Sequence, residues 1–205
     1  MDTVMLIIYA VASLLVLLLA VAVYSGLFHS IEVRTLDYPL PQINYAYKFG
    51  RGPLKNVGPI FQELARLVPG QKALAIYYDS PCEIKPENLR WAVGCVVSPS
   101  ESPSSPTLKM LQDNGYRMVT LPTADKAIQT TFPWRNIISI YISISRVWAA
   151  LLKYQNATSL CPHPWMEVYA DGVIHYIGIL DHHADFYLPE TGGVVTLPQA
   201  SEKSN

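Results

Sequence analysis

The hydrophobic pattern of the chain begins with a long apolar run from Val4 to Tyr24, in which Ser13 is the one clearly polar side chain. As a helix this run would extend about 31 Å, close to the roughly 30 Å of a bilayer's hydrocarbon core. A lone segment in lipid has to pair its backbone groups internally, which requires a helix. We therefore predict a single-pass transmembrane anchor over residues 4–27, after a short flank of residues 1–3.

A cleaved signal peptide competes with this interpretation, because Ala20-Val21-Ala22 resembles a small-residue cleavage site. No basic segment precedes the run, however, and the run is longer than the roughly 7–15 apolar residues of a signal peptide. The sequence therefore favours an uncleaved anchor.

Beyond the anchor, the pattern predicts a strand-helix-strand-strand unit. Residues 28–43 read as a juxtamembrane spacer that is Pro-rich at its end. An aromatic strand is expected at 45–49, a helix at 58–68, and strands at 73–78 and 89–97. The helix is delimited by Pro near its start and by Pro-Gly after its end.

The same order recurs in the second half of the chain. A strand is expected at 129–132, a helix at 134–152, and a hairpin of strands at 165–169 and 173–179 around Asp171-Gly172. In this alignment of the halves, Phe49 is matched with Phe132 and Trp91 with His175.

One segment of the second unit is ambiguous, because residues 138–144 alternate with period two and also fit a strand. The helical interpretation places five apolar side chains on one face: Ile137, Tyr141, Ile144, Trp148 and Leu151. We favour the helix because the repeat requires one and no helix-breaking residue occurs between Trp134 and Tyr154.

Together the two units predict an α+β domain over 44–190 with pseudo-twofold symmetry. A Ser/Pro-rich loop at 98–106, a short helix at 108–114 and a strand at 116–121 are expected between the units. Residues 191–205 form a short polar tail.

Charge argues against one class of function. The chain has 15 Lys and Arg residues against 16 Asp and Glu, for a net charge of −1. No basic stripe is present to neutralise phosphates, so the sequence argues against direct nucleic-acid binding.

The sequence gives weaker evidence about which side of the membrane the domain occupies. Cys82, Cys95 and Cys161 are odd in number and widely spaced, which fits reduced thiols in the cytosol better than a disulfide framework. Arg34 is the only basic residue soon after the span, and Asn156-Ala157-Thr158 would be a glycosylation acceptor in a lumenal domain. We favour a cytosolic domain.

Glu167 is the strongest candidate for a functional side chain, because an acid within an apolar strand is costly to bury without a partner. In a ligand groove it would attract a cation or, with a raised pKa, act as an acid or base. Alternatively, strand alternation simply points Glu167 to solvent, opposite Met166 and Val168.

Aromatic side chains on strands are candidate walls for such a groove, although aromatic residues on strands more often belong to the core. The candidates are Tyr45, Tyr47, Phe49, Trp91, Trp165 and Tyr169.

Metal and enzyme chemistry are weakly indicated. Asp181-His182-His183-Ala184-Asp185 and Cys161-Pro162-His163 contain ligand types for Zn²⁺, but adjacent His residues in a loop rarely converge on one ion. The sequence has no Ser-His-Asp spacing, phosphate-binding Gly loop or CxxC motif, so no catalytic residue, metal or cofactor is assigned.

An ordered set of segments runs from Tyr24 to Glu190 and comprises Tyr24-Ser25-Gly26-Leu27, Ala46-Tyr47-Lys48-Phe49, Tyr77-Tyr78-Asp79 with Pro81, Ala92-Val93-Gly94, Thr131-Phe132-Pro133, Arg146-Val147, Leu160-Cys161, Glu167-Val168-Tyr169 and Asp185-Phe186-Tyr187-Leu188-Pro189-Glu190. This set resembles the membrane-anchored branch of the gyrase-inhibitor-like (GyrI-like) superfamily, which includes receptors for autophagic turnover of the endoplasmic reticulum.

The resemblance implies two βαββ units around a pseudo-twofold axis, a Glu at position 167 facing a ligand groove, and a cytosolic domain anchored in the endoplasmic reticulum membrane. It also implies protein partners, either ubiquitin-like autophagy modifiers or the segregase valosin-containing protein. A small hydrophobic ligand would be a further partner.

The chain departs from the receptors of this family in its tail. Their role depends on a long acidic tail with an aromatic-x-x-aliphatic motif that adds a strand to autophagy modifiers. No aromatic residue follows Tyr187 here. Matches at 61–64, 134–137, 148–151 and 176–179 fall in expected helices or strands. The alternative function is therefore a membrane-tethered ligand-binding domain, or a hydrolase, using the Glu167 groove.

Overall fold

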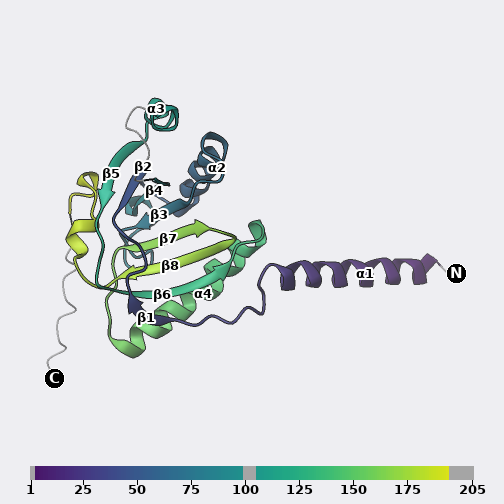
Figure 1. The fold of residues 1–205 in the computed structure, drawn as a ribbon. Helices are drawn as coiled ribbons and strands as arrows, with labels where there is room; N and C mark the ends of the chain where they lie inside the picture. Colours follow the sequence, from purple (N-terminus) through teal and green to yellow (C-terminus); the bar gives the residue numbers. More distant parts are fainter. Residues whose placement is uncertain (1–2, 99–104, 194–205) are drawn as a thin grey trace, which may run out of the picture.

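The computed structural model describes residues 3–98 and 105–193 of the chain. Helix α1 (Thr3–Tyr24) extends away from a domain in which helices pack on one large sheet (Figure 1). The expected flank before residue 3, most of the loop at 98–106 and all but the first residues of the tail lie outside the described residues.

The sheet has eight strands in the order β1-β6-β8-β7-β3-β4-β2-β5, and every neighbouring pair is antiparallel. The strands are β1 (Arg34–Asp37), β2 (Ile43–Arg51), β3 (Ala73–Tyr77), β4 (Arg90–Val97), β5 (Arg117–Leu121), β6 (Lys126–Pro133), β7 (Trp165–Ala170) and β8 (Val173–Ile179). The domain helices are α2 (Val57–Leu67), α3 (Pro106–Asp113) and α4 (Ile137–Thr158).

Two βαββ units make up the centre of this sheet, as the repeat predicts. The first is β2-α2-β3-β4, the second is β6-α4-β7-β8, and they join where β3 pairs with β7. Ala75 and Glu167 are direct partners in the middle of this pair. The expected α+β arrangement of two βαββ units is therefore confirmed.

Strand pairing shifts two of the matched positions by one residue. Tyr77 pairs with Trp91 in the first unit, and its counterpart Tyr169 pairs with Ile174 in the second. Trp91 therefore corresponds to Ile174 and not to His175. By the same register Phe132, which pairs with Ile174, corresponds to Gly50, which pairs with Trp91, and not to Phe49.

The segment after α1 differs from the expected spacer. Within 28–43, the residues of β1 pair with β6 from Arg34↔Gln129 to Asp37↔Lys126. Strand β1 thus extends the sheet at its outer edge, and the chain reaches the domain within about ten residues of α1.

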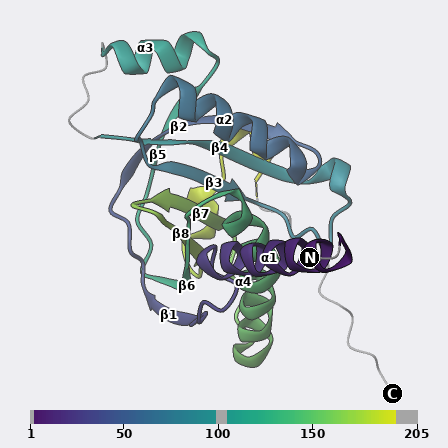
Figure 2. The same cartoon turned by 90° about the vertical axis from the view of Figure 1, so that its right-hand side faces the viewer.

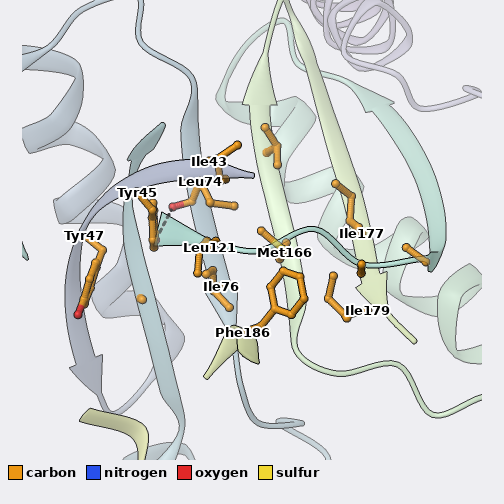
Figure 3. Close-up of a cluster of buried hydrophobic side chains, with 14 of the residues drawn as sticks. Ile43, Tyr45, Tyr47, Leu74, Ile76, Leu121, Met166, Ile177, Ile179 and Phe186 are labelled. Carbon is orange, nitrogen blue, oxygen red and sulfur yellow. Dashed lines mark hydrogen bonds between the residues drawn. The ribbon is translucent and has the colours of Figure 1, made fainter. Parts of the chain in front are cut away.

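The two faces of the sheet are covered differently. One face carries a hydrophobic cluster that includes Tyr45, Leu74, Ile76, Met166 and Phe186 (Figure 3). Connecting segments cover it, since Tyr38, Ala124 and Leu188 belong to the same cluster. Helices α2 and α4 pack on the other face through separate clusters.

Helix α4 confirms the helical interpretation of 134–152, but with a different buried face. Ser139, Ser143, Val147 and Leu151 are its buried residues. Ile137 is 62% exposed, Tyr141 69% and Ile144 53%. The small serine side chains let the helix approach the sheet, and the larger apolar side chains point sideways or outward.

Among the described residues, two helices, α1 and α4, are long and apolar enough to cross a membrane. Helix α1 has a mean hydropathy of 3.0 and no buried residue, whereas α4 has 1.3 and packs on the sheet. Length, composition and exposure together are typical of a membrane span for α1 and of a core-packed helix for α4.

Candidate functional site

A groove of about 1670 Å³ lies between α2 and α4 on the helical face of the sheet. Its lining includes residues from both helices and from the two central strands β3 and β7. The groove therefore lies on the pseudo-twofold axis, where the two units meet. Its aromatic lining residues are Phe61, Tyr77, Trp134, Tyr141, Trp148, Trp165, Tyr169, Tyr176, Tyr78 and Tyr187.

Glu167 lies on the strand that forms the floor of this groove. Alternation along β7 puts Trp165, Glu167 and Tyr169 on the helical face and Met166 and Val168 on the other. The side-chain alternation was thus correctly anticipated, but the face is covered by helices, and Glu167 is only 5% exposed.

Two tyrosines satisfy one oxygen of the Glu167 carboxylate. The Tyr169 hydroxyl donates to Oε2 at 2.9 Å, and the Tyr77 hydroxyl donates to the same atom at 3.1 Å. Tyr77 is on β3 and Tyr169 on β7, at equivalent positions of the two units. The Glu167 counterpart in the first unit is Ala75, so the twofold pattern of aromatics surrounds a single acid.

Burial dominates the electrostatics of this acid. Desolvation raises the pKa of Glu167 to about 7, although hydrogen bonding by Tyr169, Tyr77 and Trp148 acts to lower it. The carboxyl is thus close to half ionised at neutral pH. Its negative charge raises the pKa of Tyr169 and of Tyr77 in turn, in addition to their burial.

Aromatic rings hold the walls of the groove in place. Phe61 of α2 contacts the Tyr169 ring edge-on at 4.9 Å between centroids, and Trp134 does so at 5.3 Å. Trp148 of α4 and Trp165 of β7 meet at 5.3 Å, also edge-on. These pairs connect both helices to the strand that carries Glu167.

The structure brings together three of the seven groove candidates expected from sequence. Glu167, Tyr169 and Trp165 line the groove. Tyr47 and Phe49 belong to the cluster on the opposite face of the sheet, together with Tyr45. Trp91 is buried under α2, where its Nε1 donates to the Gly52 carbonyl at 3.0 Å. Placing Tyr47, Phe49 and Trp91 in the groove was wrong.

Sequence reasoning also missed several lining residues. Tyr77 was assigned only to a strand, although its counterpart Tyr169 was selected, and the repeat itself would have paired them. Phe61 and Trp148 were read as helix core positions. Tyr176 donates to Ser143 Oγ of α4 at 2.8 Å, a contact that no sequence pattern indicates.

The segment 181–185, which contains ligand types for Zn²⁺, is held in place by hydrogen bonds to the backbone. Both carboxylate oxygens of Asp181 accept backbone N–H groups, from Asp125 at 2.9 Å and Lys126 at 2.8 Å. Asp125, Asp181 and His182 place one ligand atom each within 4.8 Å of one another. Since Asp181 already closes the turn before β6, its contacts have a structural explanation.

The chain is similar to known proteins over most of its length. It is 36% identical to human testis-expressed protein 264 over 178 residues, which cover 86% of this chain and 57% of the human protein. The mouse homolog is also 36% identical, over 172 residues that cover 83% of this chain and 56% of the homolog. The chain thus spans a little over half the length of these curated relatives. No protein-family model matches it.

Solved structures with similar folds have little sequence in common with the chain. The C-terminal domain of EcmrR is 14% identical, with a TM-score of 0.44 over 74% of this chain and 97% of that domain. An uncharacterized conserved protein from Listeria innocua is 8% identical, with a TM-score of 0.44 over 72% of this chain and 92% of that protein.

The identity to the human and mouse proteins covers 86% and 83% of this chain. Over the part that it shares with these relatives, this chain is therefore testis-expressed protein 264-like.

Proposed function

We propose that the chain is a membrane-anchored adaptor whose domain binds a ligand in the groove between α2 and α4. The observation that carries this proposal is the buried Glu167, held by two tyrosine hydroxyls at the floor of a groove with apolar walls. A buried acid with a pKa near 7 destabilises the folded domain when it is ionised. A binding role gives a reason for that cost.

The groove chemistry specifies a class of ligand. Trp148, Trp165 and Phe61 offer apolar and aromatic contact area. The Glu167 carboxyl is the polar group beside them, and its Oε2 accepts the two tyrosine hydroxyls. A flat or elongated apolar molecule with a cationic or hydrogen-bond-donating group would use both features.

The adaptor part of the proposal comes from the similarity to testis-expressed protein 264 and from the family resemblance in sequence. Under it, α1 anchors the chain in the endoplasmic reticulum membrane and the domain lies in the cytosol. Autophagy modifiers or the segregase valosin-containing protein would be recruited by this domain. A pull-down with autophagy modifiers, repeated after truncation beyond Glu190, tests where the contact resides.

A hydrolase is the competing use of the same groove. It would need Glu167 to act as a base on a water or substrate. Oε2 already accepts two tyrosine hydroxyls. Among the described residues, no His, Ser or Cys side chain forms a hydrogen bond with Glu167. This arrangement favours binding over turnover.

Two fluorescent probes test the binding role on the full chain in lipid nanodiscs. Rhodamine 6G is a flat lipophilic cation and Nile red is an uncharged apolar dye. At pH 8 both dyes are expected to bind. Glu167→Gln should weaken the affinity for rhodamine 6G about tenfold and leave the affinity for Nile red unchanged. Glu63→Gln, which removes an acid on α2 outside the groove lining, is the matched control.

Failure of both dyes to bind the wild type, or an equal loss of both in Glu167→Gln, would refute the proposed ligand class.

A further inference from the structure

The end of α1 is shaped by a glycine. The Leu27 N–H donates to the Ala22 carbonyl and the Gly26 N–H to the Val23 carbonyl, both at 3.0 Å, which is the Schellman pattern. Gly26 has a φ of +102°, and a Cβ there would lie 2.8 Å from the Phe132 ring. The chain therefore turns sharply as it leaves the apolar helix and touches the domain at once.

Three side chains then fasten this turn to the start of α4. Arg135 donates to the Tyr24 carbonyl at 2.8 Å, and Asn136 Nδ2 donates to Ser25 Oγ at 2.9 Å. Arg146 donates to the carbonyls of Gly26, Leu27 and His29 at 2.7–3.0 Å. Ser25 is fully buried. The N-terminal end of α4 thus lies beside the C-terminal end of α1 in both views (Figures 1 and 2).

Large apolar side chains are exposed next to this junction. We call Trp134, Ile137, Ile138 and Tyr141 the junction patch; they are 40%, 62%, 37% and 69% exposed. The buried positions in this part of α4 are Ser139 and Ser143, so Ile137, Ile138 and Tyr141 lie outside its buried face. An exposed cluster of this kind indicates an interaction surface.

Geometry points to the bilayer as the partner. Ile137 and Ile138 directly follow Asn136, which contacts the end of the span, and Tyr141 is about one helical turn further, roughly 6 Å. Polar headgroup layers are about 5–10 Å deep on each side of the hydrocarbon core. The junction patch therefore lies within the depth of the interface.

Residue types agree with this placement. Trp and Tyr are enriched at membrane interfaces, and basic side chains favour the anionic lipids found there. Arg135 lies with its guanidinium 4.9 Å from the centre of the Tyr24 ring. From Trp134 to Leu160 the sequence has Arg135, Arg146 and Lys153 but no acidic residue.

We propose that the junction patch inserts into the interfacial layer of the same bilayer that α1 crosses. The inference rests on the proposed function in one respect, that α1 is an anchor. It deepens that function, because Trp134, Ile137 and Tyr141 also line the groove. One end of the groove then opens at the lipid surface, and its ligand is an amphiphile that enters from the membrane.

Depth-dependent quenching tests the contact in the full chain. Exposed Cys82 and Cys161 are first replaced by serine, and the buried Cys95 is kept. Single cysteines at Ile137→Cys or Tyr141→Cys are labelled with the dye NBD. The protein is reconstituted into phosphatidylcholine vesicles with phosphatidylserine, with or without doxyl-labelled lipid. Val11→Cys in α1 reports the anchor, and Lys109→Cys on the distant α3 is the matched exposed control.

The proposal expects doxyl lipid to quench the dye at positions 11, 137 and 141 but not at 109. Adding Arg146→Ala should reduce quenching at 137 and 141 while leaving position 11 quenched, because the turn after α1 is then no longer bound to α4 by the Arg146 side chain. Quenching at 11 with none at 137 and 141 overturns the contact and leaves the anchor intact. Absence of quenching at 11 overturns the anchor itself.

Discussion

Tyr77 and Tyr169 occupy equivalent positions in the two halves of the sheet, and both hydroxyls donate to the same oxygen of Glu167. The domain is therefore symmetric in its backbone and in these two aromatic residues, but asymmetric in charge. A single acid on β7 faces alanine across the axis. This asymmetry gives the groove one polar point within apolar walls, which is a common way for pockets to fix ligand orientation.

Removing either hydroxyl should raise the pKa of Glu167 further. Tyr77→Phe and Tyr169→Phe each delete a donor that stabilises the ionised carboxylate, and we expect an increase of about one pH unit for each. A titration of the ¹³C-labelled Glu167 carboxyl by NMR measures this. Tyr141→Phe, on the exposed face of α4, should leave the value unchanged. A pKa that stays constant or falls in both groove variants would show that the hydroxyls do not stabilise the charge.

Glu167 should also make the domain less stable at high pH. Its folded pKa of about 7 lies above the ordinary glutamate value of 4.5, so the folded state binds more protons than the unfolded state between these pH values. Stability is then greatest below about pH 4.5 with respect to this group, and it falls as pH rises to about 7, by roughly 3 kcal/mol at most.

Glu167→Gln removes this penalty, so its melting temperature should exceed that of the wild type at pH 8 and approach it at pH 5. Near-UV circular dichroism of the full chain in detergent follows the melting of the domain. Glu63→Gln should show the same difference in melting temperature between pH 5 and pH 8 as the wild type. If Glu167→Gln changed the melting temperature by the same amount relative to the wild type at both pH values, this would contradict the assigned pKa.

Gly94 should tolerate no side chain. A Cβ there would lie 1.8 Å from the Ala46 carbonyl oxygen, which belongs to the backbone of the paired strand β2. We expect Gly94→Ala to cost more than about 3 kcal/mol of unfolding free energy or to prevent folding. Gly58→Ala in α2 has open space around its Cβ and should stabilise by about 0.5–1 kcal/mol. Similar melting temperatures for the two variants would argue against the β2–β4 register.

Asn136 links the start of α4 to the end of α1. Its side chain accepts from the backbone N–H groups of Ile138 at 2.9 Å and Ser139 at 3.1 Å, and it also bonds Ser25. Asn136→Ala should destabilise the domain by about 1–2 kcal/mol, measured by thermal melting. Asn156→Ala, exposed in the last turns of the same helix, should change stability by less than about 0.5 kcal/mol. Equal effects would mean that the cap is energetically unimportant.

Hydrophobic periodicity predicted most strands and helices of the two βαββ units, but not β1, which lies in the expected spacer. The strands at 73–78 and 173–179 and the helix near 58–68 are local features, and each unit is antiparallel and closed by short connections. Residues 138–144 show the limit of this reasoning. Their alternation fits both a strand and a helix, and the repeat, not the local pattern, favoured the helix.

The faces of these elements depend on packing that local pattern does not contain. The apolar pattern of α4 does not predict that Ser139 and Ser143 are buried. They are buried because close approach of a helix to a sheet favours small side chains over large apolar ones. Tyr47 and Trp91 are aromatic strand residues like Tyr169, yet only tertiary structure shows that they lie away from the groove. Alternation did place Glu167 opposite Met166, but it carried no information on what covers that face.

The dependence of rhodamine 6G affinity on pH is the most direct test of the Glu167 groove. If only the ionised carboxyl attracts the cation, a pKa of about 7 predicts that the Kd of the wild type falls about tenfold between pH 6 and pH 8. Glu167→Gln should bind weakly and equally at both pH values. A wild-type Kd that does not change with pH, or a pH dependence that persists in Glu167→Gln, would contradict the assignment of Glu167 as the polar centre of a ligand site.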